Sequence, residues 1–380
     1  MQLDNNQKAF FELLRAGLWE KEARLSDFKV IDYYSILLLA EEQSVVGLVT
    51  AGLERISDVK KSKDVVRQFV GNTLQIEHRN KEMNDFVAQL IDGLRRKDVY
   101  AILVKGQGVA QCYERPLWRA CGDVDLLMSD ANYEKAKKVL MPLATEVETE
   151  YTHFKHQGMT INGFAVELHG TQHSRLSKRV DSMIDVVQKD VFYGGNVRSE
   201  EFKSSNGSRV QVFLPAPNDD VIFVFTHILH HFFFEGIGLR QLCDWCRLLW
   251  KYRSVIDVKL LEKRLRTAGL MSEWKAFAAF AVEYLGMPIE AMPLFDENDN
   301  QNANLKKKAE KVNRFVLAVG NFGHKKRRDY TGQPYLLRKF NSFWGRLSDM
   351  LRHFTIFPKD SIVFFGGVLR SGLHAAVRGE

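Results

Sequence analysis

The sequence predicts an α+β fold in which a small mixed β-sheet core is flanked by N-terminal helices and a largely helical C-terminal region. Three observations support this fold class. Apolar residues recur at helical spacing through the first ninety residues. Short β-branched runs bounded by turn residues then follow up to residue 214, and helical spacing returns from residue 218. We therefore expect an N-terminal helical region at 1–95, a core at 96–215 and a helical domain at 216–380.

The N-terminal region is predicted to be helical because its apolar residues lie three and four positions apart. The first group of such residues comprises Phe10, Phe11, Leu13 and Leu14. Two further groups have the same spacing, namely Val66, Val70 and Leu74, and then Met83, Phe86, Leu90 and Leu94. Each group would form the apolar face of a helix.

The predicted core begins with a buried strand over 99–104, which ends at the glycine turn Lys105-Gly106-Gln107-Gly108. A short helix would run from Val109 towards Tyr113 until Pro116 interrupts it. The remaining elements are a strand over 124–128, a helix over 131–140 N-capped by Asp130, a hairpin within 147–169 with turn signals at Gln157-Gly158 and Asn162-Gly163, and a strand over 209–214.

The C-terminal part is predicted to begin with a helix, because Asn218 or Asp219 can N-cap a run that extends through residue 233. His227, His231 and Glu235 lie four positions apart on this stretch. Side chains at this spacing could bind zinc. A simpler interpretation is that they line a cleft or are core histidines with satisfied hydrogen bonds.

Two other features of the C-terminal part have structural interpretations. Cys243 and Cys246 lack the second close pair that a zinc site requires, so we expect them in the core. The polar stretch 296–302 is expected to be an exposed loop.

The composition excludes several classes of protein. Of the 380 residues, 45% are apolar and 27% are charged, which matches neither a disordered, a collagenous nor a disulfide-stapled chain. The longest apolar runs, such as residues 221–225, fall far short of the roughly 18 residues needed to cross a bilayer. The first residues lack the basic segment followed by an apolar segment that is typical of a secretory signal peptide. We therefore expect a cytoplasmic protein without a transmembrane segment.

Positive charge is concentrated towards the C-terminus. From Gln301 to Glu380 there are sixteen Lys and Arg against five Asp and Glu, whereas the net charge of the whole chain is +7. The block 324–328 could meet phosphates or an anionic membrane, or it could be a solvated helical face. An apolar helical stripe over 336–354 is expected to pack against the protein rather than form a membrane foot.

Two carboxylates in a predicted strand are the first candidates for chemistry. Asp123 and Asp125 lie at positions i and i+2, so their side chains would project to the same side of the strand. Carboxylate oxygens in this arrangement can hold one hard divalent cation such as Mg²⁺. The same spacing also occurs on surface strands that bind no metal.

The glycine turn after the first strand is a candidate phosphate site. A turn between a strand and a helix exposes backbone N–H groups near the positive end of the helix dipole, and Lys105 adds a cation. Position 111 is Gln, so the third glycine of a dinucleotide fingerprint is absent, and no Walker ending follows. The alternative interpretation is a tight turn without a ligand.

The order of these motifs resembles the nucleotidyltransferases of the DNA polymerase beta superfamily. The shared pattern is Lys-Gly, then Arg119, then Gly-Asp-x-Asp-Leu-Leu, then a strand ending Val166-Glu167-Leu168-His169. More closely, the chain is similar to a bacterial branch known as uncharacterised nucleotidyltransferase family 5, which residues 214–219 and 236–245 also resemble. The resemblance covers most of residues 95–255.

The resemblance implies two strands that carry three carboxylates, matched here by Asp123, Asp125 and Glu167. These residues would be both catalytic and metal-ligating, holding two Mg²⁺ ions that bridge a nucleoside triphosphate, such as ATP, and the attacking hydroxyl. Glu167 would ligate the catalytic ion or accept the proton of the acceptor. By strand alternation alone, Glu167 could instead be an outward-facing carboxylate.

The resemblance also implies a set of nucleotide-binding residues, Lys105, Gly106, Gln107, Gly108 and Arg119. The superfamily generally has Gly-Ser after the first strand, whereas Gln107 follows the glycine here, so Lys105 and the backbone would replace the serine hydroxyl. Lys-Gly openings also occur in this branch and in abortive-infection toxin nucleotidyltransferases. Arg119 resembles an arginine of antibiotic nucleotidyltransferases, and it would clamp a phosphate, hold the aspartates or pair with one carboxylate.

The resulting expectation is a Mg²⁺-dependent nucleotidyltransferase that acts on an anionic acceptor. A small or lipid-linked phosphorylated sugar is favoured, because the C-terminal segment lacks the interleaved aromatic and basic residues expected for single-stranded RNA. The alternatives are toxin-like action on RNA and a catalytically silent binding module of the same fold. Because clustered carboxylates repel one another, we expect Asp123→Asn and Asp125→Asn to leave metal-free stability unchanged or higher.

Overall fold

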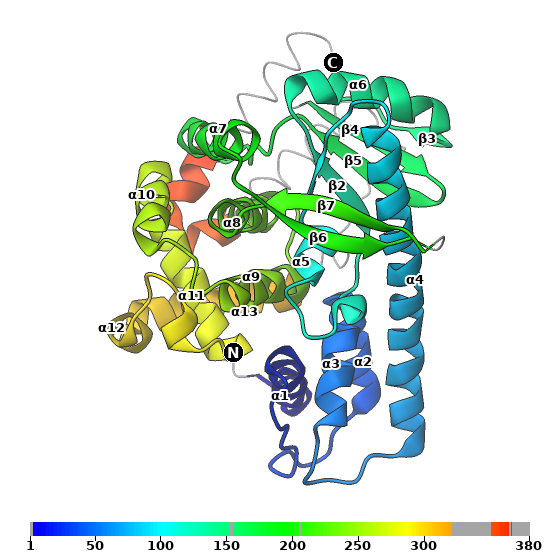
Figure 1. Ribbon diagram of the computed structural model, residues 1–380. Coiled ribbons are helices and arrows are strands. Elements are labelled where there is room, and N and C mark those ends of the chain that lie inside the picture. Colours follow the sequence, from blue (N-terminus) through cyan, green and yellow to red (C-terminus); the bar gives the residue numbers. More distant parts are fainter. Residues whose placement is uncertain (1–2, 152–154, 205–206, 321–350, 365, 367–380) are drawn as a thin grey trace, which may run out of the picture. The chain divides into compact units, whose positions relative to one another are not determined.

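The computed structural model describes residues 3–151, 155–204, 207–320, 351–364 and 366. The chain divides into two compact units, of which the first comprises Met1–His173, Ile184–Val224 and Cys243–Ile256, and the second comprises Ser174–Met183, Phe225–Leu242 and Asp257–Glu380. The first unit contains N-terminal helices and a mixed sheet, and the described part of the second is helical (Figure 1). The α+β fold class is therefore confirmed, whereas the three-part domain division stays a prediction.

Four helices form the N-terminal part of the first unit. They are α1 (Asn5–Trp19), α2 (Tyr33–Glu42), α3 (Val46–Glu54) and the long α4 (Lys63–Arg95) (Figure 1). Side chains cap three of these helices, because the carboxylates of Asp4 and Asp32 and the hydroxyl of Ser62 accept backbone N–H groups of the first turn. The helical prediction for this region is confirmed.

The buried face of α4 differs from the predicted one in its first half. Val66 and Leu74 are exposed, whereas Phe69 and Thr73 are buried at neighbouring positions. Thr73 is satisfied there by hydrogen bonds to the Phe69 carbonyl and the Thr50 hydroxyl. The apolar pattern therefore identified the helix correctly but misassigned its inner face before residue 75.

A five-stranded mixed sheet forms the centre of the first unit. Its strands lie in the order β1 (Ile102–Val104), β2 (Asp123–Leu127), β5 (Phe164–His169), β4 (His156–Ile161) and β3 (Glu146–Val147). β2 and β5 are parallel, and all other neighbours are antiparallel. The predicted hairpin is confirmed as β4 and β5, with the turn at Asn162-Gly163.

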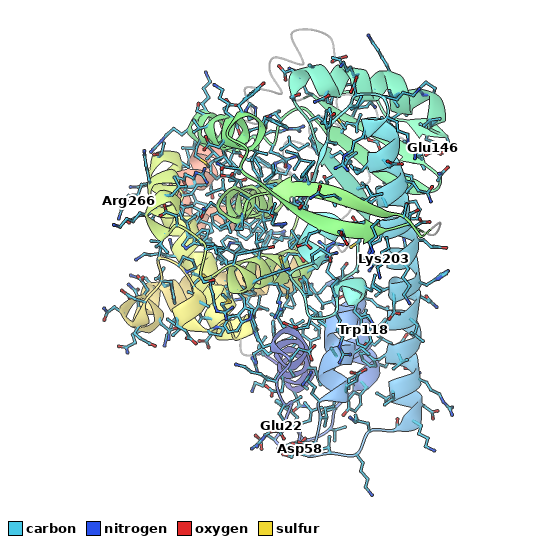
Figure 2. The ribbon with its side chains drawn as sticks, viewed as in Figure 1. Glu22, Asp58, Trp118, Glu146, Lys203 and Arg266 are labelled. Atoms are coloured by element: carbon cyan, nitrogen blue, oxygen red, sulfur yellow. The ribbon has the colours of Figure 1, made fainter. Side chains whose placement is uncertain are left out.

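Short helices connect these strands. They are α5 (Gly106–Ala110), the 3-10 turns Pro116–Trp118 and Met141–Leu143, and α6 (Asp130–Leu140). Ser129, rather than Asp130, occupies the N-cap position of α6, so that expectation was wrong by one residue. The side chain of Trp118, labelled in Figure 2, donates from Nε1 to Glu77 on α4 at 2.7 Å.

Two elements before residue 216 had not been expected. α7 (Lys178–Tyr193) follows the sheet, and β6 (Val197–Lys203) forms an antiparallel pair with β7 (Arg209–Pro215), which was expected. Apolar residues on α7, including Val180, Ile184 and Val187, do recur at helical spacing and could have revealed it. In β6 only Phe202 is buried, so its sequence alternation is weak.

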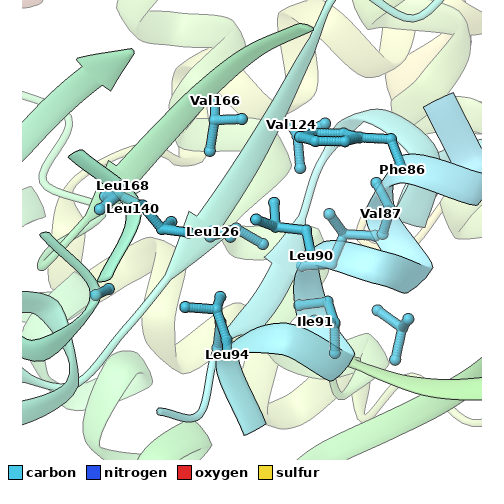
Figure 3. Packing of buried hydrophobic residues seen from close by; sticks show 14 of the residues in the cluster. Phe86, Val87, Leu90, Ile91, Leu94, Val124, Leu126, Leu140, Val166 and Leu168 are labelled. Carbon is cyan, nitrogen blue, oxygen red and sulfur yellow. The ribbon is translucent and has the colours of Figure 1, made fainter. Parts of the chain in front are cut away.

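One face of the sheet is apolar and packs against helices. Val124 and Leu126 of β2 face Val87 and Leu90 of α4, whereas Leu168 of β5 lies beside Leu140 of α6, as Figure 3 shows. The same cluster includes residues of α6, β6 and β7. Because side chains alternate along a strand, the intervening residues of β2 and β5 face the opposite side.

The described part of the second unit is helical. Besides residues that α8 (Pro217–Phe234) and α9 (Leu239–Lys251) contribute, it contains α10 (Val258–Ala268), α11 (Met271–Leu285), α12 (Glu297–Gln301), α13 (Ala303–Val319), a 3-10 turn at Ile289–Ala291 and helical residues at 351–354 and 358–364. The stretch 296–302, expected as a loop, instead forms α12, because Asp296 and Asp299 make a capping box.

Two expectations for the C-terminal segment concern residues that are not described. The basic block 324–328 lies outside the described ranges, as does the stripe from 336 to 350. Among the residues that the structure does describe, none belongs to a helix both long and apolar enough to cross a bilayer.

The packing of α4 on the sheet generates the first testable prediction. Leu126 is fully buried between these elements, so Leu126→Ala should lower the free energy of unfolding by about 2–5 kcal/mol through lost burial and a cavity. Chemical denaturation measures this change. Leu74→Ala, at an exposed position of α4, is the control and should change it by less than about 0.5 kcal/mol. Equal effects of the two variants would contradict the assigned core.

Candidate active site

Three carboxylates meet on the polar face of the sheet. Asp123 and Asp125 lie on β2, and the parallel register pairs Asp125 with Glu167 on β5. Paired residues of neighbouring strands point to the same face, so Asp125 and Glu167 lie side by side in the sheet although they are 42 positions apart in the chain. One oxygen from each carboxylate lies within 4.8 Å of the others. The structure thus brings together the three predicted acids.

Lys105 reaches this group from the end of β1. Its backbone has a φ of +56°, a region that residues with a side chain rarely adopt, and it precedes α5 directly. Its Nζ donates a hydrogen bond to Asp125 Oδ1 at 2.8 Å, and its side chain is 14% exposed. Gly106 follows with a φ of +34°, and a Cβ there would lie 3.2 Å from the Asp123 carbonyl oxygen. The Lys-Gly turn after β1 and the Asp-x-Asp pair on β2, which were predicted to form one site, are therefore in contact.

Two histidines complete the polar group, and neither was predicted from the sequence to have a role in it. His169 Nε2 lies 2.8 Å from Asp125 Oδ1 and 3.3 Å from Glu167 Oε2. His156 Nε2 lies 3.1 Å from the same Glu167 oxygen. The signal was present in the sequence, since a two-residue turn at Asn162-Gly163 fixes a register that pairs positions 156 and 169.

The charges of this group stabilise one another. Burial raises the pKa of Asp125, but the Lys105 ammonium and the hydrogen bond from His169 outweigh it, so the pKa lies below its ordinary value. Burial likewise raises the pKa of Glu167, and hydrogen bonds from His156 and His169 reverse the shift. For Lys105, burial lowers the pKa, whereas Asp125 and Glu167 raise it above its usual value. Asp125 and Glu167 are therefore anionic, and Lys105 is cationic, at neutral pH.

The residues of the glycine turn are buried rather than open. Gln107 is 1% exposed, and its Nε2 is directed at the Met83 sulfur of α4. A Cβ at Gly108 would collide with the side chain of Leu214 on β7. The Gln107 side chain therefore faces the core, and after Lys105 only the backbone groups of Gly106, Gln107 and Gly108 are left to meet a phosphate. Nucleotide binding by Gly106, Gln107 and Gly108 stays a prediction.

Arg119 forms a buried ion pair within the first unit. Its Nε and Nη2 donate to the two carboxylate oxygens of Asp244 on α9, at 3.1 and 2.5 Å. Tyr113 also donates to Asp244, at 2.7 Å. Burial lowers the pKa of Arg119, but Asp244 outweighs burial and raises it well above its usual value. Of the alternatives left open for Arg119, the geometry matches pairing with one carboxylate, and phosphate binding stays a prediction.

The histidines of α8 interact with one another in the second unit. His231 Nδ1 lies 2.7 Å from Glu235 Oε2, and its Nε2 lies 3.0 Å from His227 Nε2. His231 is buried and Glu235 is exposed. These contacts fit satisfied histidines on one helical face.

The thiols of α9 have a structural environment. Cys243 and Cys246 are fully buried free thiols, as expected for core packing. Burial raises the pKa of both, so neither is a thiolate at neutral pH.

This site has the features of an enzyme that transfers phosphorus-containing groups, since it combines clustered carboxylates, a cation and a glycine turn on one sheet. The family model of an uncharacterised nucleotidyltransferase family matches residues 30–286, and the chain belongs to this family. The sequence-based assignment to that family and to this enzyme class is confirmed. No curated protein and no solved structure gives a significant match. The roles of individual site residues stay predictions.

The contact between Lys105 and Asp125 revises one expectation. Repulsion among the acids predicted unchanged or higher stability for Asp125→Asn, but this variant would leave the Lys105 ammonium buried beside a neutral amide. We now expect Asp125→Asn to lower the free energy of unfolding by about 3 kcal/mol in metal-free protein near neutral pH. Chemical denaturation measures the loss, and Asp123→Asn, at a half-buried position, should lose less.

The same variant has an expected pH dependence in metal-free protein. Because the folded pKa of Asp125 is lowered, its stabilisation is present above the unfolded pKa of about 3.9 and is lost as pH falls through the folded pKa. Because the folded pKa of Lys105 is raised, its contribution is present below about 10.4 and is lost as pH rises through the folded pKa. The stability difference between wild type and Asp125→Asn should therefore be largest between these limits. A difference independent of pH would contradict the ion pair.

The Arg119–Asp244 pair generates a further prediction. Arg119→Met and Asp244→Asn should each lower the free energy of unfolding by about 3 kcal/mol, because each leaves a buried group without its charged partner. The double variant should lose clearly less than the sum of the two, as a double-mutant cycle measured by denaturation would show. Strict additivity would mean that the pair does not form.

Proposed function

We propose that this nucleotidyltransferase transfers a nucleoside monophosphate from a nucleoside triphosphate to a hydroxyl or phosphate acceptor, with Mg²⁺ bound by Asp123, Asp125 and Glu167. The observation that carries the proposal is the convergence of these three carboxylates within 4.8 Å on one face of the sheet, in a chain of this family. Oxygen donors of this kind fit Mg²⁺, which prefers carboxylates, phosphates and water.

Each carboxylate has a proposed role. Asp123 and Asp125 hold both ions, and Glu167 binds the catalytic ion or accepts the proton of the acceptor. When bound, the ions supply charge stabilisation for the entering and leaving oxygens at the α-phosphorus. A bond forms between the acceptor oxygen and the α-phosphorus, the bond from that phosphorus to the bridging oxygen breaks, and pyrophosphate leaves.

Lys105 has a proposed role in binding the triphosphate. Its ammonium already lies 2.8 Å from Asp125, so it can contact a phosphate oxygen that approaches the metal-binding carboxylates. Backbone N–H groups of Gly106, Gln107 and Gly108 would complete the contacts to the phosphates. Arg119, paired with Asp244, would act by fixing the segment that leads into β2. In this role Arg119 would hold the aspartates in place and would not clamp a phosphate directly.

The acceptor is proposed from charge. The excess of sixteen basic over five acidic residues after position 300 favours an anionic acceptor. We favour a small or lipid-linked phosphorylated sugar, with RNA as the alternative acceptor. Incubation with α-labelled nucleotides and either total RNA or a metabolite extract separates the two, because the label marks the acceptor. Label found only in RNA would contradict the sugar acceptor.

Substitution of the three acids tests the reaction itself. Asp123→Asn, Asp125→Asn and Glu167→Gln should each reduce transfer of α-labelled nucleotide by at least about 100-fold, as expected for groups that act together in the transition state. The matched control is Glu146→Gln, at an exposed position on β3 of the same sheet (Figure 2), which should keep wild-type activity. Circular dichroism confirms that each variant is folded. If the wild type transfers no label to either fraction with any nucleotide, the silent binding module becomes the better account.

A further inference from the structure

We propose that His156, Glu167 and His169 form a binding site for a divalent first-row transition-metal ion, beside the two aspartates of β2. The inference concerns the identity and position of one ion in the same site, and its relevance to transfer rests on the proposed function. The ligand assignment itself rests only on the geometry of the three side chains.

The donor atoms of the three side chains lie at distances that suit one metal ion. His156 Nε2 and His169 Nε2 lie 3.1 and 3.3 Å from one oxygen, Glu167 Oε2, and all three atoms lie within 4.8 Å of one another. Metal bonds to imidazole nitrogen and carboxylate oxygen are about 2.0–2.2 Å long, so neighbouring ligand atoms around one ion lie about 3.0–3.5 Å apart. The observed separations between each nitrogen and the oxygen fall in that range.

Two paired strands of the sheet carry the three ligands. His156 and His169 are directly paired in the antiparallel register of β4 and β5, and Glu167 pairs with Gly158. All three side chains therefore share one face of the sheet. Ligands placed on neighbouring strands need little rearrangement to enclose an ion.

The absence of a side chain at Gly158 leaves room on this face for the side chain of Glu148. A Cβ at that position would collide with the carboxylate of Glu148, so a fourth carboxylate lies over the strand pair opposite Glu167. Glu148 is exposed, and its negative charge on this side of the sheet favours the approach of a cation.

The chemistry of the three donor atoms favours a transition-metal ion over Mg²⁺. Two imidazole nitrogens with one carboxylate oxygen suit first-row transition ions, whereas Mg²⁺ is usually bound by oxygen alone. Glu167 belongs to this set and also to the set with Asp123 and Asp125. The Glu167 carboxylate can therefore be shared by two ion sites, one formed with the aspartates and one formed with the histidines.

The test uses the full-length protein, stripped of metal and titrated with Mn²⁺, and reads nitrogen ligation directly. Pulsed electron paramagnetic resonance of bound Mn²⁺ should show coupling to ¹⁴N in the wild type. His156→Ala and His169→Ala should remove the coupling of the lost ligand and raise the dissociation constant at least about tenfold, since even outer partners of metal ligands change affinity by about 10–100-fold. His156→Ala is decisive if His169→Ala, which also removes a partner of Asp125, does not fold.

The control is another histidine that contacts a carboxylate in the same unit. His173 Nε2 lies 2.7 Å from Asp185 Oδ1, so His173→Ala removes a comparable contact away from the proposed ligands and should leave Mn²⁺ binding unchanged. Bound Mn²⁺ without nitrogen coupling, an affinity insensitive to His156→Ala, or no binding of Mn²⁺ would each overturn the proposed site.

Failure of this inference can be distinguished from failure of the proposed function. Nucleotide transfer that proceeds with Mg²⁺, together with Mn²⁺ spectra that lack nitrogen coupling, overturns the histidine site and leaves the function standing. Nitrogen coupling in a protein that transfers no nucleotide supports the site and removes the proposed function.

Discussion

The contact between the Lys105 ammonium and the Asp125 carboxylate is the interaction on which the rest of the site depends. Clustered carboxylates repel one another unless cations neutralise them. Lys105 provides the charge from one side of β2, and His169 provides a hydrogen bond from the other. Because Asp125 is only 3% exposed, water cannot replace these partners. The site is therefore assembled and balanced before any ligand binds.

Alternation along the strands gives the sheet one apolar face for the core and one polar face for the site. Val124 and Leu126 bury one face of β2 under α4, and this packing fixes the backbone. Asp123 and Asp125 lie at the intervening positions, so the same fixed backbone also holds their carboxylates in place on the polar face. The parallel pairing of β2 with β5 then sets Glu167 opposite Asp125. Core stability and site geometry thus come from the same pair of strands.

The sequence predicted the elements whose signals are local. The β-branched run before Lys105, the two aspartates at i and i+2, and the Asn162-Gly163 turn each lie within a few residues, and all three features are found in the structure. Contacts between distant residues were not predictable in the same way. Arg119 and Asp244 are 125 positions apart, and the core-facing Gln107 depends on how α4 packs. The partners of Glu167 follow from the hairpin register, which the turn encodes but which the spacing of the acids does not reveal.

In the proposed reaction, the three carboxylates bind a nucleotide through a divalent ion. Calorimetric titration with ATP, GTP, CTP and UTP in the presence of Mg²⁺ tests this binding most directly, because binding precedes any question about the acceptor. We predict that the wild type binds at least one of the four, and that folded Asp123→Asn, which spares the Lys105–Asp125 contact, loses that binding. Absence of binding heat for all four nucleotides in folded wild-type protein, or undiminished binding by Asp123→Asn, would contradict the claim.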